Sequence, residues 1–135
     1  MRRIVMIVAV LTLAGCATPN VPPASSAADA AEEQWVGQAL RTGGNGQTCL
    51  AGQVKFLFKV KSSTLYAYSP RISDISSYNS EASAVVPLKA DGSANEVVRL
   101  RNGDSGRVTV SAGKGARSID LNTMNQNCSY RFSPM

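Results

Sequence analysis

The sequence predicts an all-β fold, a small antiparallel β-sandwich or barrel of about six to eight short strands. Several short segments of the 135-residue chain alternate apolar and polar residues with a period of two. Clusters of Gly, Asn, Asp and Ser separate these segments at regular intervals, as turns do. Apolar residues make up 44% of the chain, so it is not fully disordered and can form one modest core.

The first element of the domain has two interpretations. Ser26 and Asp29 have the spacing of a capping box, and Gly43 follows at a distance that suits a helix end. This pattern favours a short helix over about residues 27–40. The segment from Trp35 to Arg41 fits a first β-strand equally well. The sequence leaves both open.

The strongest strand signal lies just after Cys49. Its apolar side chains face one way, and they are Val54, Phe56, Phe58 and Val60. Its lysines face the other way, and they are Lys55, Lys59 and Lys61. Residues Leu65–Tyr68 follow a turn at Ser62 and Ser63 and are the predicted partner strand.

Weaker strand signals continue to the end of the chain. Ser69–Ser83 is the longest predicted loop, and Ala84–Lys89 is a weak strand that Pro87 places at a sheet edge. A turn follows at Asp91 and Gly92. The remaining predicted elements are a hairpin of Glu96–Arg101 and Arg107–Ala112 around the loop Asn102–Gly106, and two short strands at Ser118–Leu121 and Cys128–Phe132.

The N-terminus carries the most specific motif. Arg2 and Arg3 precede the apolar run Ile4–Ala14, which is too short to cross a bilayer core of about 30 Å but has the length of a secretory h-region. The run ends in Leu13-Ala14-Gly15-Cys16. This motif resembles the lipobox of bacterial lipoproteins, in which a signal peptidase cleaves before the cysteine and the cysteine thiol carries diacylglycerol. An ordinary signal peptide that contains a cysteine and an uncleaved anchor are the alternatives.

The resemblance implies a domain plan and an address. Residues 1–15 would be a lipoprotein signal peptide, and Cys16 would carry acyl chains such as palmitate, which anchor the protein to the membrane. Residues 16–34 are rich in Ala, Pro and Ser and are predicted to be a lipidated, flexible tether, and residues 35–135 are the β-domain. Ala17 follows the cysteine, which by the sorting rule of many Gram-negative lipoproteins implies the periplasmic face of the outer membrane.

Two cysteines, Cys49 and Cys128, remain if Cys16 carries lipid. An even remainder in an exported protein predicts a disulfide. Closing a loop of about 80 residues contributes about 4.5 kcal/mol of stability in the chain-entropy model. Free thiols and a redox pair are the alternatives, although the chain has no Cys-x-x-Cys motif and no histidine to lower a thiol pKa.

The missing histidine also argues against catalysis. It excludes the Ser-His triad, the Cys-His dyad and His-containing metal sites. The spacing of the carboxylates singles out no catalytic pair. We therefore expect no metal, no cofactor and no enzymatic activity.

Basic residues outnumber acidic residues by 14 to 9. The predicted strands place Lys55, Lys59 and Lys61 on one solvent face, and Arg99 and Arg101 on one face of another strand. Together they predict a positive face for an anionic partner, such as lipopolysaccharide, peptidoglycan or an acidic envelope protein. The alternative is an ordinary solvated sheet face whose lysines discourage aggregation. Nucleic acid is not an expected partner of an exported protein.

These observations favour a non-enzymatic lipoprotein with a binding or structural role in the cell envelope. A periplasmic inhibitor of a lytic enzyme or protease is the second hypothesis, with the loop Ser69–Ser83 or the tip Asn102–Gly106 entering the enzyme's cleft. This analogy rests on general architecture only. An envelope enzyme of unknown activity is the third.

Overall fold

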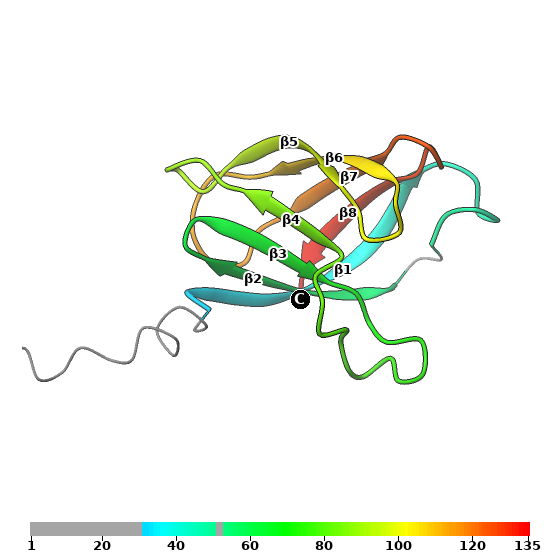
Figure 1. The fold of residues 1–135 in the computed structure, drawn as a ribbon, viewed down its shortest axis with the longest axis horizontal. Coiled ribbons are helices and arrows are strands. Elements are labelled where there is room, and N and C mark those ends of the chain that lie inside the picture. The colour runs from blue at the N-terminus through cyan, green and yellow to red at the C-terminus, as the bar shows by residue number, and fades with distance from the viewer. Residues whose placement is uncertain (1–30, 51–52) are drawn as a thin grey trace, which may run out of the picture.

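The structure is a computed structural model that describes residues 31–50 and 53–135, and every strand in it belongs to one antiparallel sheet (Figure 1). The eight strands are β1 (Glu33–Gly43), β2 (Lys55–Lys61), β3 (Thr64–Tyr68), β4 (Ala84–Pro87), β5 (Ala94–Arg99), β6 (Ser105–Val110), β7 (Ile119–Thr123) and β8 (Ser129–Pro134). The described residues form no helix. The all-β prediction is confirmed. The predicted signal peptide, Cys16 and most of the predicted tether lie outside the described residues.

The sheet curls into a nearly closed up-and-down barrel. Its strand order is β4-β3-β2-β1-β8-β7-β6-β5, so consecutive strands pair everywhere except between β4 and β5, and β8 returns to pair with β1. The two edge strands, β4 and β5, meet along a seam. At one end of this seam, Arg101 N donates to Ser83 O at 2.9 Å. Of the two predicted architectures, the barrel is therefore correct. Pro87 lies on the edge strand β4, as predicted.

β1 is a strand, and the helix alternative is wrong for the described part of that segment. Trp35 pairs with Phe58 of β2, and Ala39 pairs with Phe132 of β8. β1 thus supplies backbone partners to two strands at once, which outweighs the local helix signal. The sheet also starts earlier than the predicted domain boundary at residue 35. Glu32 N donates to Val60 O at 2.8 Å, and β1 begins at Glu33.

The alternation predicted for the strongest strand is observed in β2. Phe58 and Val60 are buried, Phe56 and Val54 pack against the core, and Lys55 is exposed. The inner face of the barrel holds a cluster of aromatic rings whose centroids are 4.9 to 6.4 Å apart. Its members are Trp35, Phe56, Phe58, Tyr130 and Phe132. These offset and tilted ring contacts add stability beyond their buried area.

The barrel has two unlike ends. The turns β2–β3, β4–β5 and β6–β7 and the start of β1 lie at one end, which we call the N-terminal end and which is at the left of Figure 1. The connections β1–β2, β3–β4, β5–β6 and β7–β8 lie at the other end, which we call the disulfide end. There Cys49 and Cys128 are joined by a disulfide, so the predicted pairing is confirmed.

Candidate functional site

The barrel encloses a cavity of about 580 Å³ that opens at the disulfide end. Its inner walls are apolar, and they include Phe56, Leu65, Val86, Val108, Ile119 and Phe132. Its mouth is polar and includes Thr48, Ser69, Ser83, Arg101, Asn102 and Gln126. The volume lies in the range of small-molecule sites. An eight-stranded barrel is at the size where the interior either fills with side chains or holds one small ligand. This barrel is only partly filled.

Two small residues leave this space open. Ala67 of β3 and Ala84 of β4 are directly paired across the sheet, and both line the cavity. The next inward pair towards the N-terminal end is Leu65 and Val86, which are fully buried. The same two strands thus fill the barrel at one end and leave room at the other, because large inward side chains give way to methyl groups.

The mouth of the cavity is braced by the carboxylate of Asp104. This buried side chain accepts hydrogen bonds from the backbone N–H groups of Ser105 (2.6 Å), Asn125 (3.0 Å) and Gln126 (3.3 Å). It thereby joins the β5–β6 connection to the β7–β8 connection. The N–H of Asn125 in particular holds the pKa of Asp104 below its ordinary value, because it stabilises the charged form.

The disulfide braces the other side of the mouth. Cys49 lies in the β1–β2 connection, and Cys128 lies between β7 and β8. Leu50 N, next to Cys49, donates to the hydroxyl of Tyr130 at 2.7 Å. The β1–β2 connection is therefore held against the cavity by one covalent bond and one hydrogen bond.

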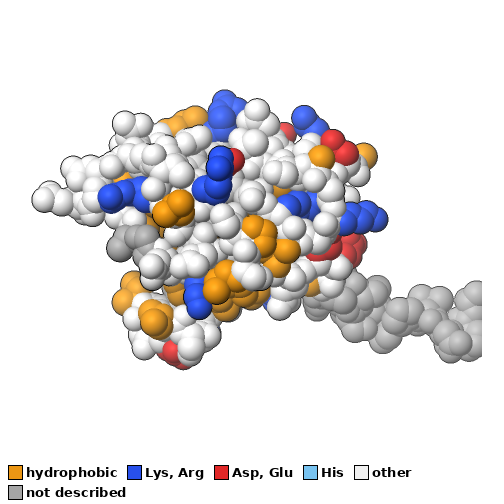
Figure 2. Space-filling model, turned by 180° about the vertical axis from the view of Figure 1, so that it is seen from behind, with side chains coloured by type: hydrophobic (Ala, Val, Ile, Leu, Met, Phe, Trp, Pro, Cys, Tyr) orange, Lys and Arg blue, Asp and Glu red, His pale blue; other side chains and the backbone are white. Residues whose placement is uncertain are grey.

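The β3–β4 loop, residues Ser69–Ser83, lies beside the mouth and is ordered by its own side chains. Asp74 accepts hydrogen bonds from Ser76 Oγ at 2.6 Å and from Ser77 Oγ at 3.1 Å, and these bonds lower the pKa of Asp74. The loop nevertheless presents Ile72 and Ile75 to solvent, with relative exposures of 104% and 83%. Figure 2 shows hydrophobic side chains on this loop, the lobe at its lower left.

Arg101 is the one charged residue among the described residues that line the cavity. Its backbone spans the seam through the bond to Ser83, which fixes the position of the residue. Its side-chain Nε is 3.4 Å from Oε2 of Glu81, in a pair whose side chains are 49% and 75% exposed. A positive charge thus lies at the mouth, and among residues 31–50 and 53–135 its ion-pair partner is the exposed carboxylate of Glu81.

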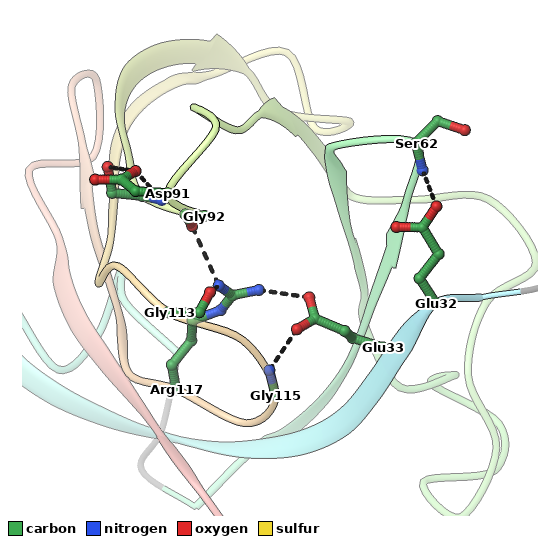
Figure 3. Close-up of polar contacts among 9 residues, drawn as sticks. Glu32, Glu33, Ser62, Asp91, Gly92, Gly113, Gly115 and Arg117 are labelled. Atoms are coloured by element: carbon green, nitrogen blue, oxygen red, sulfur yellow. Dashed lines mark hydrogen bonds and ion pairs between the residues drawn. The ribbon is translucent and has the colours of Figure 1, made fainter.

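The N-terminal end of the barrel is closed by Arg117 (Figure 3). Its guanidinium donates to Glu33 Oε2 at 2.7 Å and to the carbonyl oxygens of Gly92 and Gly113. It also lies over the ring of Trp35, with 5.4 Å from Cζ to the centroid. Sequence reasoning missed this cluster. Glu33 and Arg117 are far apart in the sequence, so no local pattern indicates that they pair. Glu33 also fell within the predicted tether.

The structure does not bring the five predicted basic residues onto one face. Lys55, Lys59 and Lys61 lie along the outside of β2, where Lys59 and Lys61 lie over the rings of Tyr68 and Tyr66 at 5.4 and 5.6 Å. Arg99 ends β5, and Arg101 follows it. β3 and β4 lie between these two groups, so the curvature of the barrel separates them. The basic side chains in Figure 2 are likewise scattered.

Within residues 31–50 and 53–135, no three His, Cys, Asp or Glu side chains lie close enough together to hold a metal ion. The described residues contain no helix with the length and apolar character that a bilayer crossing requires. Comparisons of this chain with protein-family models, curated proteins and solved structures find no match.

Proposed function

We propose that this chain is a non-enzymatic binding protein of the bacterial cell envelope that holds a small apolar ligand inside its barrel. We further propose that lipid on Cys16 anchors it to the periplasmic face of the outer membrane. The observation that carries the binding role is the apolar cavity with its braced, polar mouth. The lipobox-like motif at residues 13–16 supports the address, and the disulfide is consistent with an oxidising compartment.

The size of the cavity sets the expected affinity. A ligand of about 25 non-hydrogen atoms, at about 0.3 kcal/mol per atom, has a dissociation constant in the micromolar range. We expect the mouth to change little on binding, because Asp104 and the disulfide hold its loops in place. Such pre-organisation removes part of the entropic cost of binding.

The proposal is tested by filling the cavity. The protein used is the exported chain with Cys16→Ser, which keeps the tether and the barrel and leaves out only the proposed lipid. We expect it to bind the neutral fluorescent probe N-phenyl-1-naphthylamine saturably at one site. Ala84→Phe and Ala67→Leu place larger side chains in the cavity and should each weaken binding by about tenfold or more.

The matched control is Val85→Phe, because Val85 neighbours Ala84 on β4 but is exposed on the outside of the barrel. This variant should bind the probe like the parent chain. Melting curves verify that every variant folds. Undiminished binding by both folded cavity variants, or failure of the parent chain to bind, would contradict the proposal.

A second candidate function is inhibition of an envelope enzyme by the β3–β4 loop. The observation that favours it is that the loop is ordered internally yet exposes Ile72 and Ile75. The test is crosslinking in intact cells, followed by an activity assay of any captured enzyme. Inhibition that is lost in Ile72→Ser/Ile75→Ser supports this role. Inhibition unaffected by the substitutions, or capture of no enzyme, rejects it.

A further inference from the structure

The cavity has a mostly apolar interior and, among the described residues, a single charged lining residue, Arg101, at its mouth. Two polar atoms of its walls are already used by the protein. The hydroxyl of Tyr130 accepts the bond from Leu50 N, and Thr123 Oγ1 accepts one from Cys128 N at 2.9 Å. A charged ligand group deep in the barrel would lose its hydration without a charged partner, which is strongly unfavourable. The buried part of a ligand is therefore apolar, and any charge on it stays at the mouth.

The width of the barrel limits the shape of the apolar part. An eight-stranded barrel leaves an interior only about as wide as the side chains that would otherwise fill it. Here Phe56, Phe58 and Phe132 already occupy part of that interior, with Phe56 and Phe132 centroids 4.9 Å apart. Such a narrow, ring-lined space suits one alkyl chain, or a small aromatic probe of one or two fused rings, better than a rigid compound of four fused rings.

Arg101 determines the chemistry of the other end of the ligand. A guanidinium presents a planar fork of donors that matches a carboxylate or a phosphate. Its present partner, Glu81, is mostly exposed, and exposed ion pairs of this kind are weak. An anionic group at the mouth can therefore compete with Glu81 for Arg101. The backbone bond to Ser83 keeps Arg101 at the rim whichever anion it pairs with.

We infer that the cavity takes a single-chain anionic amphiphile, with its alkyl chain inside the barrel and its carboxylate or phosphate head at Arg101. This inference rests on the proposed function, and it names the class of the ligand. Arg101 contacts the head group directly. Glu81 acts as a competing anion that the head group displaces.

The experiment compares ligands that share one chain length and differ in the head group. Palmitate, hexadecyl phosphate and hexadecanol, each below its aggregation concentration, displace N-phenyl-1-naphthylamine from the exported Cys16→Ser chain. The charge-assisted bonds to Arg101 should give at least one of the two anions about tenfold higher affinity than the alcohol. Preference for palmitate alone identifies a fatty acid, and preference for hexadecyl phosphate alone identifies a lipid phosphate.

Two variants should shift the anion preference in opposite directions. Arg101→Gln keeps the backbone N–H that bonds Ser83 and should abolish the preference for the anions over hexadecanol. Glu81→Gln removes the competing carboxylate and should strengthen binding of the preferred anion. The matched control is Arg99→Gln, because Arg99 is the last residue of β5, two positions before Arg101, but does not line the cavity.

The outcomes separate the inference from the proposed function. Equal affinity for the alcohol and both anions, or an anion preference that survives Arg101→Gln, overturns the head-group assignment but leaves the apolar-ligand proposal intact. Failure of the probe and all three ligands to bind overturns both. Melting curves of each variant verify that a lost preference does not come from a lost fold.

Discussion

Arg117 and Glu33 form a buried ion pair across the N-terminal end of the barrel, with 2.7 Å between Nη2 and Oε2. Only 6% of the Arg117 side chain and 17% of the Glu33 side chain are exposed. Glu33 also accepts a hydrogen bond from Gly115 N, and Arg117 reaches the carbonyls of Gly92 and Gly113. The pair thus ties the start of β1 to the β4–β5 and β6–β7 turns.

Removing one member of this pair should strongly destabilise the barrel. Arg117→Met leaves the Glu33 carboxylate buried without its cation, and we expect the free energy of unfolding to fall by about 3–5 kcal/mol. Urea denaturation measures the loss. The control is Arg131→Met, whose exposed pair with Asp120 should contribute no more than about 1 kcal/mol. An equally small loss in Arg117→Met would show that the buried pair does not stabilise the fold.

The disulfide should contribute a large part of the stability. It spans 79 residues, and Cys49→Ser/Cys128→Ser should reduce the free energy of unfolding by about 4.5 kcal/mol in the chain-entropy model. Chemical denaturation of the double variant and of the oxidised parent chain measures the difference. Because Cys49 lines the cavity, the double variant should also bind the fluorescent probe more weakly. Unchanged stability would contradict the stabilising role of the disulfide, and unchanged probe binding would contradict its role at the cavity.

The proposed lipid anchor predicts a simple change in location. Cys16→Ser, expressed with an ordinary cleavable secretory signal in place of residues 1–15, should move the protein from the membrane fraction to the soluble fraction, because in this proposal the acyl chains alone anchor the processed chain. Cell fractionation followed by immunoblotting measures the distribution. The companion variant Ala17→Asp keeps the cysteine and should remain in membranes. Retention of Cys16→Ser in washed membranes at high salt would mean that the anchor is not lipid on this residue.

Asp104 should make stability depend on pH in the acid range. Its pKa is lower in the folded protein than its ordinary value of 3.8, because backbone N–H groups stabilise the carboxylate. Its contribution is therefore complete above pH 3.8 and is lost as the pH falls through the lower, folded pKa.

Asp104→Asn should accordingly lower the melting temperature at neutral pH, and its difference from the parent chain should shrink in acid. Melting curves recorded between pH 7 and about pH 2 measure this difference. The control is Asp120→Asn, which removes a carboxylate that pairs with Arg131 in an exposed position. The opposite result is that the melting temperatures of Asp104→Asn and the parent chain differ by the same amount at every pH. That result would argue against a stabilising role for the Asp104 charge.

The strands were predictable wherever one face is buried. The residues Val54 to Val60 alternate apart from the outward Leu57, and their inward side chains pack in or against the core as predicted. β1 was ambiguous because its inward residues include Gly37 and Ala39, which carry little apolar side chain to mark a buried face. The pairing of β1 with both β2 and β8 decides its structure, and that information lies elsewhere in the chain.

The candidate site was largely invisible in the sequence. Ala67 and Ala84 lie in segments predicted as strands, but their direct pairing depends on the register across a long loop. The sequence signal that could have indicated the cavity is the small inward residue on each strand, Ala67 and Ala84. The separation of the five predicted basic residues was invisible for a related reason, since a single strand's alternation does not reveal how a barrel distributes its strands around the axis.

The return of β8 to β1 has a consequence for the kinetics of folding. Other strand pairs join elements that follow each other in the chain, so their hairpins can form locally and early. β1 and β8 must meet after a long loop has closed, which carries an entropic cost that grows with loop length. Cys49 and Cys128 lie in the connections that flank these two strands. Oxidation before folding therefore holds the two ends of the barrel near each other, and the oxidised chain should refold faster than the reduced chain.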